Sequence, residues 1–340
     1  MKTHFSFPGF GIGTHLLNRV AFTLFGVIEV HWGGLLTLFA ICLSLICVIL
    51  RAVRSERLGG TAVFDCALVA VLSGAVCARA FYVLLTLDRA VYATAWDVID
   101  VWNGGGLAWG AILGGFVGIL IMACVKRISW KRLLDAAAPA WLLGLAVGSW
   151  SALFSGAVPG AVVDTHTVFD LFGLRLRLPS GEGTLFHVLR MGLEKYGVFA
   201  YYQPTFLYEC VWSAIGFIVL NIVYKRKKFN GQVALMGLAW YALGSILIDG
   251  LEADALYISG TSLRLSQCVG ALCLIAATVA LVALCRKYAN NDPFARPVPP
   301  HPDDAQWKNK EDNALSRALE RALIKRKNNN KEKMKHGNKN

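Results

Sequence analysis

The chain has 340 residues, of which 56% are hydrophobic and 16% charged, and its net charge is +12. Soluble domains carry about 25% charged residues, so this composition indicates a membrane protein. The positive charge does not point to a nucleic-acid partner, because residues 286–340 hold 14 Lys and Arg against 7 Asp and Glu and read as a polar tail. We therefore expect membrane lipids, and no nucleic acid, as partners.

Seven apolar runs are long enough to cross a bilayer, which takes a helix of about 20 residues. In chain order they are residues 31–50, 62–86, 104–125, 136–158, 205–224, 233–248 and 265–285. Backbone polar groups in lipid must be satisfied inside their own segment, so each run is predicted to be a helix. The predicted fold class is an all-α integral membrane protein with seven transmembrane helices.

The loops between these runs alternate in charge. Three loops are strongly basic, at residues 51–57, 126–132 and 224–228. The other three are balanced or acidic, at residues 85–103, 159–203 and 249–264. Basic loops of membrane proteins face the cytoplasm. The pattern therefore predicts an N-terminus outside, a cytoplasmic C-terminus, and a small external loop domain formed by the longest non-basic loop.

Two further boundaries follow from composition. Residues 1–290 are predicted to form the membrane domain, and residues 291–340 a polar, basic cytoplasmic linker and tail. The first ten residues, MKTHFSFPGF, lack the apolar core of a cleavable signal peptide. We expect no signal peptide.

Small residues recur at every fourth position in two of the predicted helices. In the third helix they are Gly106, Gly110, Gly114 and Gly118, and in the fourth Gly144, Gly148, Ala152, Gly156 and Gly160. Small residues let helix backbones approach closely in lipid. We expect these two faces to pack against each other.

Ionisable residues at membrane depth are costly and usually functional. In this chain they gather at the predicted outer ends of the helices: His31, Arg79, Tyr208, Glu209, Asp249, Glu252 and Arg264. Simpler roles are also open. His31 could belong to an interfacial belt, Arg79 could extend to the headgroups, and Glu209 could interact with a helix dipole. The asymmetry nevertheless predicts a polar site at the level of the outer headgroups.

Taken in chain order, six stretches resemble the prolipoprotein diacylglyceryl transferase family of bacterial inner-membrane enzymes. They are FTLFGVIEVHWGGLL (22–36), ARAFYVL (78–84), VWNGGGLAWGAILGG (101–115), QPTFLYE (203–209), NGQV (230–233) and IDGLEADALYISGTSLRLSQ (248–267). Each stretch alone is a weak signal, but six in the family's order make a specific one. The resemblance also implies seven helices with the N-terminus outside.

The resemblance implies that the protein transfers the diacylglyceryl group of phosphatidylglycerol to a cysteine thiol in the lipobox of prolipoprotein signal peptides. This reaction is the first step of lipoprotein maturation in the bacterial inner membrane. It implies no cofactor, and no Cys or His spacing in the sequence suits a metal. The thiol must become a thiolate, because the thiolate is the nucleophile. The departing phosphate ester needs cations or hydrogen-bond donors.

These two needs divide the candidate residues. The candidates for catalytic proton transfer are His31, Glu209, Asp249 and Glu252. The candidates for phospholipid binding are Arg79, Arg264, Tyr208, Gln203 and Ser149. Which of the four catalytic candidates accepts the thiol proton stays open at this stage.

Several polar positions of the family are replaced in this chain. Ser149 stands where the family has a lipid-clamping arginine, and Trp109 stands where it has His or Tyr ahead of a Gly-Gly-Leu segment. The other replacements are Gly33, Ala152, Ser155, Ala157, Gln203, Ser245 and Glu252. The alternative is therefore a catalytically inactive member that binds phospholipid or lipoprotein precursors. A transporter is disfavoured, because the charges cluster at one leaflet and not at the midplane.

Overall fold

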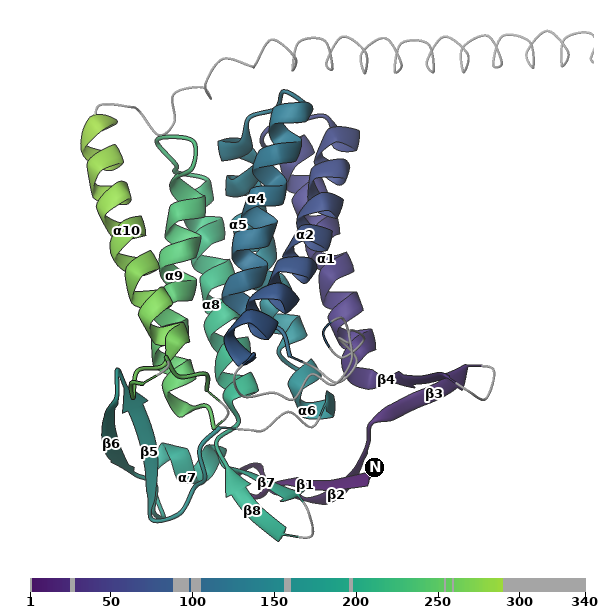
Figure 1. The fold of residues 1–340 in the computed structure, drawn as a ribbon, viewed down its shortest axis with the longest axis vertical. Helices are drawn as coiled ribbons and strands as arrows, with labels where there is room; N and C mark the ends of the chain where they lie inside the picture. The colour runs from purple at the N-terminus through teal and green to yellow at the C-terminus, as the bar shows by residue number, and fades with distance from the viewer. Residues whose placement is uncertain are drawn as a thin grey trace, which may run out of the picture.

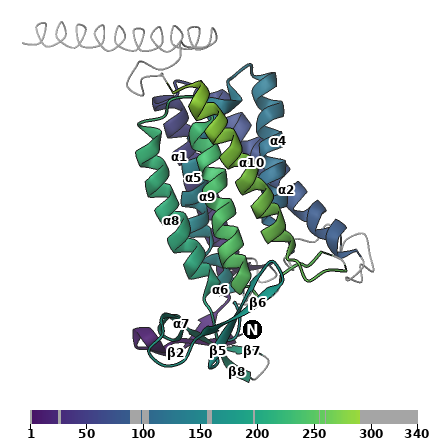
Figure 2. The ribbon, with the colours of Figure 1, turned by 90° about the vertical axis from the view of Figure 1, so that its left-hand side faces the viewer.

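A computed structural model describes residues 2–24, 28–87, 98, 105–155, 160–195, 198–253, 255–258 and 260–289. Its dominant feature is a bundle of long helices that run side by side (Figures 1 and 2). They are α1 (Trp32–Arg54), α2 (Gly60–Thr86), α4 (Ala108–Val125), α5 (Trp130–Gly148), α8 (Thr205–Tyr224), α9 (Gln232–Ile248) and α10 (Leu265–Lys287). All seven are long and apolar enough to cross a membrane. The predicted number of spans is confirmed.

The fourth helix differs most from its predicted limits. It begins at Trp130 instead of residue 136, and after Gly148 the chain continues into the short helix α6 (Ser151–Ser155). The early start brings Arg132 and Asp135 into the helix, where both are buried. Pro139 lies inside α5, so proline does not end this helix as it would often do in water.

The outer surface of the bundle is apolar, which is the reverse of a soluble protein. Leu72 of α2 is 58% exposed, and Leu272 of α10 is 69% exposed. Side chains of this kind on membrane-length helices are expected to contact lipid chains. Buried residues of α1, α5, α8 and α9 are instead often small, such as Ala52, Ala140, Gly216 and Ala242.

The glycines of α4 pack on α2 and not on α5, so the predicted pairing was wrong. A Cβ atom added at Gly110 would lie 2.9 Å from the carbonyl oxygen of Cys77, and Gly114 and Gly118 also face α2, around Ser73. The hydroxyl of Ser73 donates a hydrogen bond to the carbonyl oxygen of Gly114 at 2.9 Å. Spacing identified the close contact correctly but could not identify the partner, because every small-residue face is equally suited to any other.

The small residues of α5 face α1. Gly148 lies beside Ala40, whose Cβ would be 3.5 Å from a Cβ added at Gly148. One turn earlier Gly144 faces Ser44, and the Ser44 hydroxyl donates to the carbonyl oxygen of Ala140 at 3.0 Å. The two small-residue stretches therefore hold two separate helix pairs together, α2 with α4 and α1 with α5.

Strands gather at one end of the bundle (Figure 1), which we call the strand end. They form a four-stranded sheet in the order β2-β1-β7-β8 and two hairpins, β3-β4 and β5-β6. Their bounds are β1 (Lys2–Phe7), β2 (Ile12–Asn18), β3 (Val20–Leu24), β4 (Ile28–His31), β5 (His166–Leu171), β6 (Leu174–Pro179), β7 (Met191–Lys195) and β8 (Val198–Tyr202). The short helices η1 (Pro8–Phe10) and α7 (Leu185–Leu189) lie beside them.

The predicted loop domain at 159–203 thus contains strands, and the N-terminal residues join it. Phe5 of β1 pairs with Leu193 of β7 in antiparallel register. This pairing of segments far apart in sequence has no local signature, so the sequence did not predict it. The all-α description holds for the membrane-spanning part of the fold.

The three basic loops lie together at the opposite end of the bundle, which we call the basic end (Figure 1). The helices alternate in direction, and the chain enters at the strand end and leaves α10 at the basic end. This arrangement agrees with the predicted alternation of loops. Which end faces the cytoplasm stays a prediction from charge, and the predicted tail at 291–340 lies outside the described residues.

Candidate active site at the strand end

Asp249 lies at the strand end, in the short helix η2 (Asp249–Leu251) that follows α9. Its carboxylate accepts hydrogen bonds from the hydroxyls of Ser245, one turn earlier in α9, and Ser266, in the first turn of α10. Arg264 attracts the same carboxylate electrostatically. Donors from two helices and a nearby cation therefore fix its position.

The side chain of Arg264 holds the backbone of this region in place. It is the N-cap residue of α10 and is only 6% exposed. Its guanidinium donates from Nη1 to the backbone carbonyl oxygens of Asp249 and Glu252, the latter at 3.0 Å, and its Nε lies 3.5 Å from Oδ2 of Asp170 in β5. These contacts join η2, α10 and the β5-β6 hairpin. The sequence predicted Arg264 as a phospholipid-binding residue, and its described hydrogen bonds go to backbone carbonyl oxygens.

Two further groups share the electrostatic surroundings of Asp249. Glu209, in the second turn of α8, is half-buried and interacts electrostatically with Asp249. Tyr241, two turns before Asp249 in α9, interacts electrostatically with Asp249, Glu209 and Glu252. Glu209 and Asp249 therefore interact with each other, and Glu252 acts with them on Tyr241. We call these three residues the carboxylate cluster (Glu209, Asp249 and Glu252).

Gln203 and Tyr208 lie beside this cluster and bind each other. The Tyr208 hydroxyl donates to Oε1 of Gln203 at 2.6 Å, and Nε2 of Gln203 donates to Oγ1 of Thr167 at 3.2 Å. Gln203 and Thr167 are both fully buried. This chain of hydrogen bonds attaches the start of α8 to strand β5, so both predicted phospholipid-binding residues have a positioning contact.

Gly160, the last small residue of the predicted stretch, lies outside α5 and α6 and contacts the same region. The backbone N–H of Gly160 donates to the carbonyl oxygen of Gln203 at 2.8 Å, and that of Ala161 donates to Leu251 at 2.5 Å. A Cβ atom at Gly160 would lie 2.6 Å from the Leu251 oxygen, so only glycine fits. Gly160 therefore helps to hold the start of α8 against η2.

Arg79 lies near the strand end of α2. It donates from Nε to the carbonyl oxygen of Val98 and from Nη1 to that of Gly105, each at 2.9 Å. Gly105 has a φ of +84°, and a Cβ atom there would be 2.7 Å from Nη1 of Arg79. The arginine and the glycine-rich stretch before α4 thus fit each other closely.

The structure places His31 and Ser149 in local roles. His31 precedes α1 at the end of the β3-β4 hairpin, its side chain is 50% exposed, and its Nε2 lies 3.9 Å from Oε2 of Glu29. Ser149 is the C-cap residue of α5, and its hydroxyl donates to the carbonyl oxygen of Ala146 at 3.2 Å. The described contacts of both side chains stay within their own segments.

An aromatic group inside the bundle was not among the predicted site residues. The ring of Tyr241 lies 5.2 Å from that of Trp109 in α4 and 4.7 Å from that of Trp141 in α5, measured between centroids. Three helices therefore meet at Tyr241. The sequence signal was present, because Trp109 interrupts a run of glycines, but aromatic residues in apolar helices are common packing residues.

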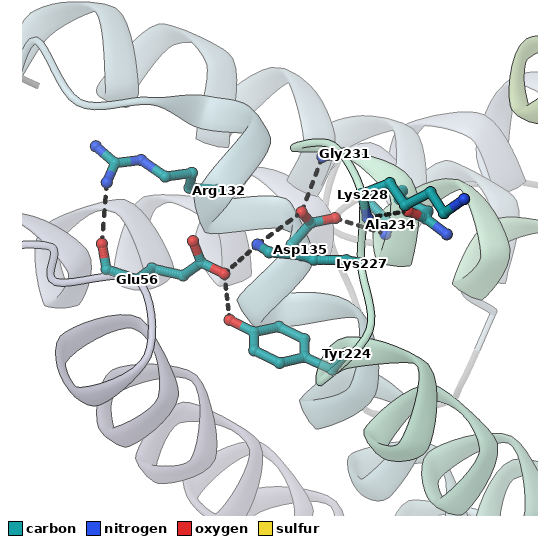
Figure 3. Close-up of polar contacts among 9 residues, drawn as sticks. Glu56, Arg132, Asp135, Tyr224, Lys227, Lys228, Gly231 and Ala234 are labelled. Carbon is teal, nitrogen blue, oxygen red and sulfur yellow. Dashed lines mark hydrogen bonds and ion pairs between the residues drawn. The ribbon is translucent and has the colours of Figure 1, made fainter. Parts of the chain in front are cut away.

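A second buried polar cluster lies at the basic end and was also missed (Figure 3). Asp135 of α5 is fully buried and accepts hydrogen bonds from the backbone N–H groups of Gly231 at 2.8 Å and Ala234 at 3.0 Å. These N–H groups belong to the first turn of α9, so Asp135 caps that helix from a neighbouring one. Lys227 lies 3.1 Å from the same carboxylate.

Lys227 also pairs with Glu56, which connects α1 to α2 and is 6% exposed. Glu56 accepts a hydrogen bond from the Tyr224 hydroxyl, and its backbone carbonyl oxygen accepts one from Nη1 of Arg132 at 3.0 Å (Figure 3). All three basic loops are therefore joined through one network. Charge counting along the sequence showed only their excess of lysine and arginine.

Comparison with known proteins identifies the family. Residues 19–283 match the family described as prolipoprotein diacylglyceryl transferase. A relative named phosphatidylglycerol–prolipoprotein diacylglyceryl transferase, from Lysinibacillus sphaericus, is 33% identical over 78% of this chain and 92% of its own length. Relatives of the same name from Bacillus licheniformis and Listeria innocua are 34% identical over 78% of this chain and 92% of theirs, and 30% identical over 84% and 95%, respectively. The chain belongs to the prolipoprotein diacylglyceryl transferase family.

Proposed function

We propose that this protein transfers the diacylglyceryl group of phosphatidylglycerol to prolipoproteins, and that the reaction takes place at the strand end. The single observation that carries the proposal is the family match from residue 19 to residue 283, which covers all of the helical bundle except the last turn of α10. The names of relatives at 30–34% identity support the activity and the two substrates. The carboxylate cluster supports the placement of the reaction at the strand end.

The acceptor is the cysteine thiol of a lipobox in the signal peptide. In the transfer, the sulfur forms a bond to the glycerol carbon that carries the phosphate, and the bond between that carbon and the phosphate oxygen breaks. Glycerol phosphate leaves with the electron pair, and the thiol loses its proton. The protein must therefore supply a proton acceptor for the thiol and positive groups or donors for the leaving phosphate.

Glu209 is the proposed proton acceptor. Asp249 already accepts hydrogen bonds from Ser245 and Ser266, and the backbone beside Glu252 is held by Arg264. Glu209 differs, because its described interaction is electrostatic, with Asp249. A half-buried carboxylate at the start of α8 suits proton transfer from a peptide that approaches from the lipid.

Arg79 is the proposed phosphate-binding cation, and Arg264 a positioning residue for η2 and Asp249. Arg79 is half-buried at the strand end of α2 and adjoins the backbone of the glycine-rich stretch at Gly105. A planar guanidinium suits the oxygens of a phosphate ester. Gln203 and Tyr208 complete the region by attaching α8 to β5.

We also propose that this is a multi-pass protein of the cytoplasmic membrane of a bacterium, with its strand end outside. The seven helices support the multi-pass arrangement. The basic loops support the orientation, since basic loops stay in the cytoplasm. Membrane lipids would surround the bundle and supply phosphatidylglycerol from the outer leaflet.

The test is transfer by the purified protein in detergent with phosphatidylglycerol and a lipobox peptide. We expect the mass of one diacylglyceryl group to be added to the cysteine, and no addition to a matched peptide with serine in its place. Absence of transfer, under conditions in which the Bacillus licheniformis relative is active, would contradict the proposal. Phospholipid bound without turnover would then favour a non-catalytic lipid-binding protein.

A further inference from the structure

The indole of Trp109 is unusual among the tryptophans of the bundle. It is 8% exposed, and in the described part of the chain its Nε1–H has no hydrogen-bond partner. By contrast, Trp212 and Trp240 each donate to the other's backbone carbonyl oxygen, at 3.0 and 3.1 Å. Buried donors are normally satisfied by protein, water or ligand, so the donor of Trp109 calls for a partner.

This donor lies deeper in the helical bundle than the carboxylate cluster. Trp109 is in the first turn of α4, and its ring edge at Cζ2, next to the Nε1 side, would lie 3.5 Å from a Cβ atom at Gly270. Gly270 is five residues into α10 from Leu265, which at 1.5 Å per residue is about 8 Å below the start of the helix. Ser266, at that start, donates to Asp249.

On one side the indole of Trp109 packs against aromatic rings. Tyr241 lies against Trp109 and is itself packed against Trp141. Gly270 admits the indole edge because it has no side chain. An indole N–H is neutral and can only donate. It can neither take a proton nor balance a negative charge, so it suits a neutral oxygen acceptor.

We propose that Trp109 Nε1–H donates a hydrogen bond to an ester carbonyl oxygen of the bound diacylglyceryl group and so positions the lipid. This inference rests on the proposed function, and it adds a residue that fixes the depth of the lipid. The ester groups of a glycerolipid lie just below its phosphate, as the indole lies just below the carboxylate cluster.

The test compares diester phosphatidylglycerol with its diether analogue, which lacks both ester carbonyls but keeps the phosphate ester that breaks. For the unmodified protein we expect kcat/KM to be about two- to tenfold higher for the diester, the range of one neutral hydrogen bond. Trp109→Phe should lower the diester value by the same factor and leave the diether value unchanged, so the preference disappears. Benzothienylalanine at position 109 removes the N–H but keeps the shape of the indole, and it should behave in the same way.

The matched control is Trp212→Phe, which removes an indole N–H that already has a partner within the bundle. It should leave the diester preference intact. Equal losses on both lipids in the Trp109 variants, or a preference that persists in them, would overturn the proposal. If the unmodified protein transfers neither lipid, the proposed function fails, and equilibrium binding of the two lipids to the same variants still decides the role of Trp109.

Discussion

At the basic end, the buried carboxylates of Asp135 and Glu56 share Lys227, and each accepts a further hydrogen bond. At the strand end, Glu209 and Asp249 interact with each other across α8 and η2, and two like charges are brought near one another. In the first arrangement, loss of one partner would leave a buried charge unpaired, which is strongly destabilising. The second costs stability, and such a cost is typical of a site that performs chemistry.

The difference shows how two similar sets of residues acquire different roles. Both ends contain acids, a cation and a tyrosine on membrane-length helices. At the basic end the network joins three loops and caps α9 (Figure 3). At the strand end the hydrogen bonds of Arg264 and Gln203 fix the backbone around the carboxylates. Substitutions should therefore reduce stability at one end and activity at the other.

The largest effect should come from Glu209→Gln, because the variant cannot take the thiol proton. We expect kcat/KM for peptide lipidation to fall about 10²- to 10⁴-fold, with the protein still folded. The control is Glu29→Gln on the exposed β3-β4 hairpin, where the side chain is 59% exposed. If Glu209→Gln lipidates the peptide at the rate of the unmodified protein, Asp249 or Glu252 must be the proton acceptor instead.

Asp135→Ala tests the other side of the comparison. It leaves Lys227 near one carboxylate instead of two and removes the cap of α9, so the free energy of unfolding should fall by about 3–5 kcal/mol. Denaturation in detergent measures this. The control is Asp65→Ala, which removes an ion pair with Lys126 whose side chains are 37% and 35% exposed, respectively. The free energy of unfolding should fall by only about 0–1 kcal/mol. A stable Asp135→Ala protein with reduced kcat would assign a catalytic role to the basic end.

Arg79→Ala should reduce kcat/KM about 10²- to 10³-fold, the usual loss for one donor to a leaving anion. Arg79→Lys keeps the charge but loses the planar guanidinium group. Its activity should therefore lie between that of the unmodified protein and that of Arg79→Ala. The control is Arg54→Ala, which removes the same charge from an exposed position at the basic end of α1. Equal activity in Arg79→Ala and Arg54→Ala would remove Arg79 from the site.

Tyr208→Phe should have the smallest effect of the four. It deletes the donor to buried Gln203, and the expected loss is about 1–3 kcal/mol in the free energy of unfolding. Because the hydroxyl positions α8 and does not contact the reacting atoms in our proposal, kcat should fall much less than in Glu209→Gln. Tyr288→Phe, near the basic end of α10, is the matched control. A loss of kcat as large as that of Glu209→Gln would make Tyr208 a catalytic residue.

Much of the candidate site could be predicted, because the acids and arginines stand out against apolar helices. Glu209, Asp249 and Glu252 were identified in this way, and the structure brings them together. His31 and Ser149 were named for their positions in motifs, and their described contacts are local. Asp135 was missed because its helix starts before the apolar run. Trp109 was named only as a replaced position of the family, because the lack of a hydrogen-bond partner has no sequence signature.

The sequence by itself determined the seven helices, the alternation of basic and non-basic loops, and the family, since each depends on local hydrophobicity or on residues in a fixed order. Only the tertiary structure decided that the glycines of α4 face α2, that the N-terminal strands pair with β7, and that Arg264 holds the backbone of η2. These contacts join residues far apart in the chain. Their energies depend on which surfaces meet, and no single segment contains that information.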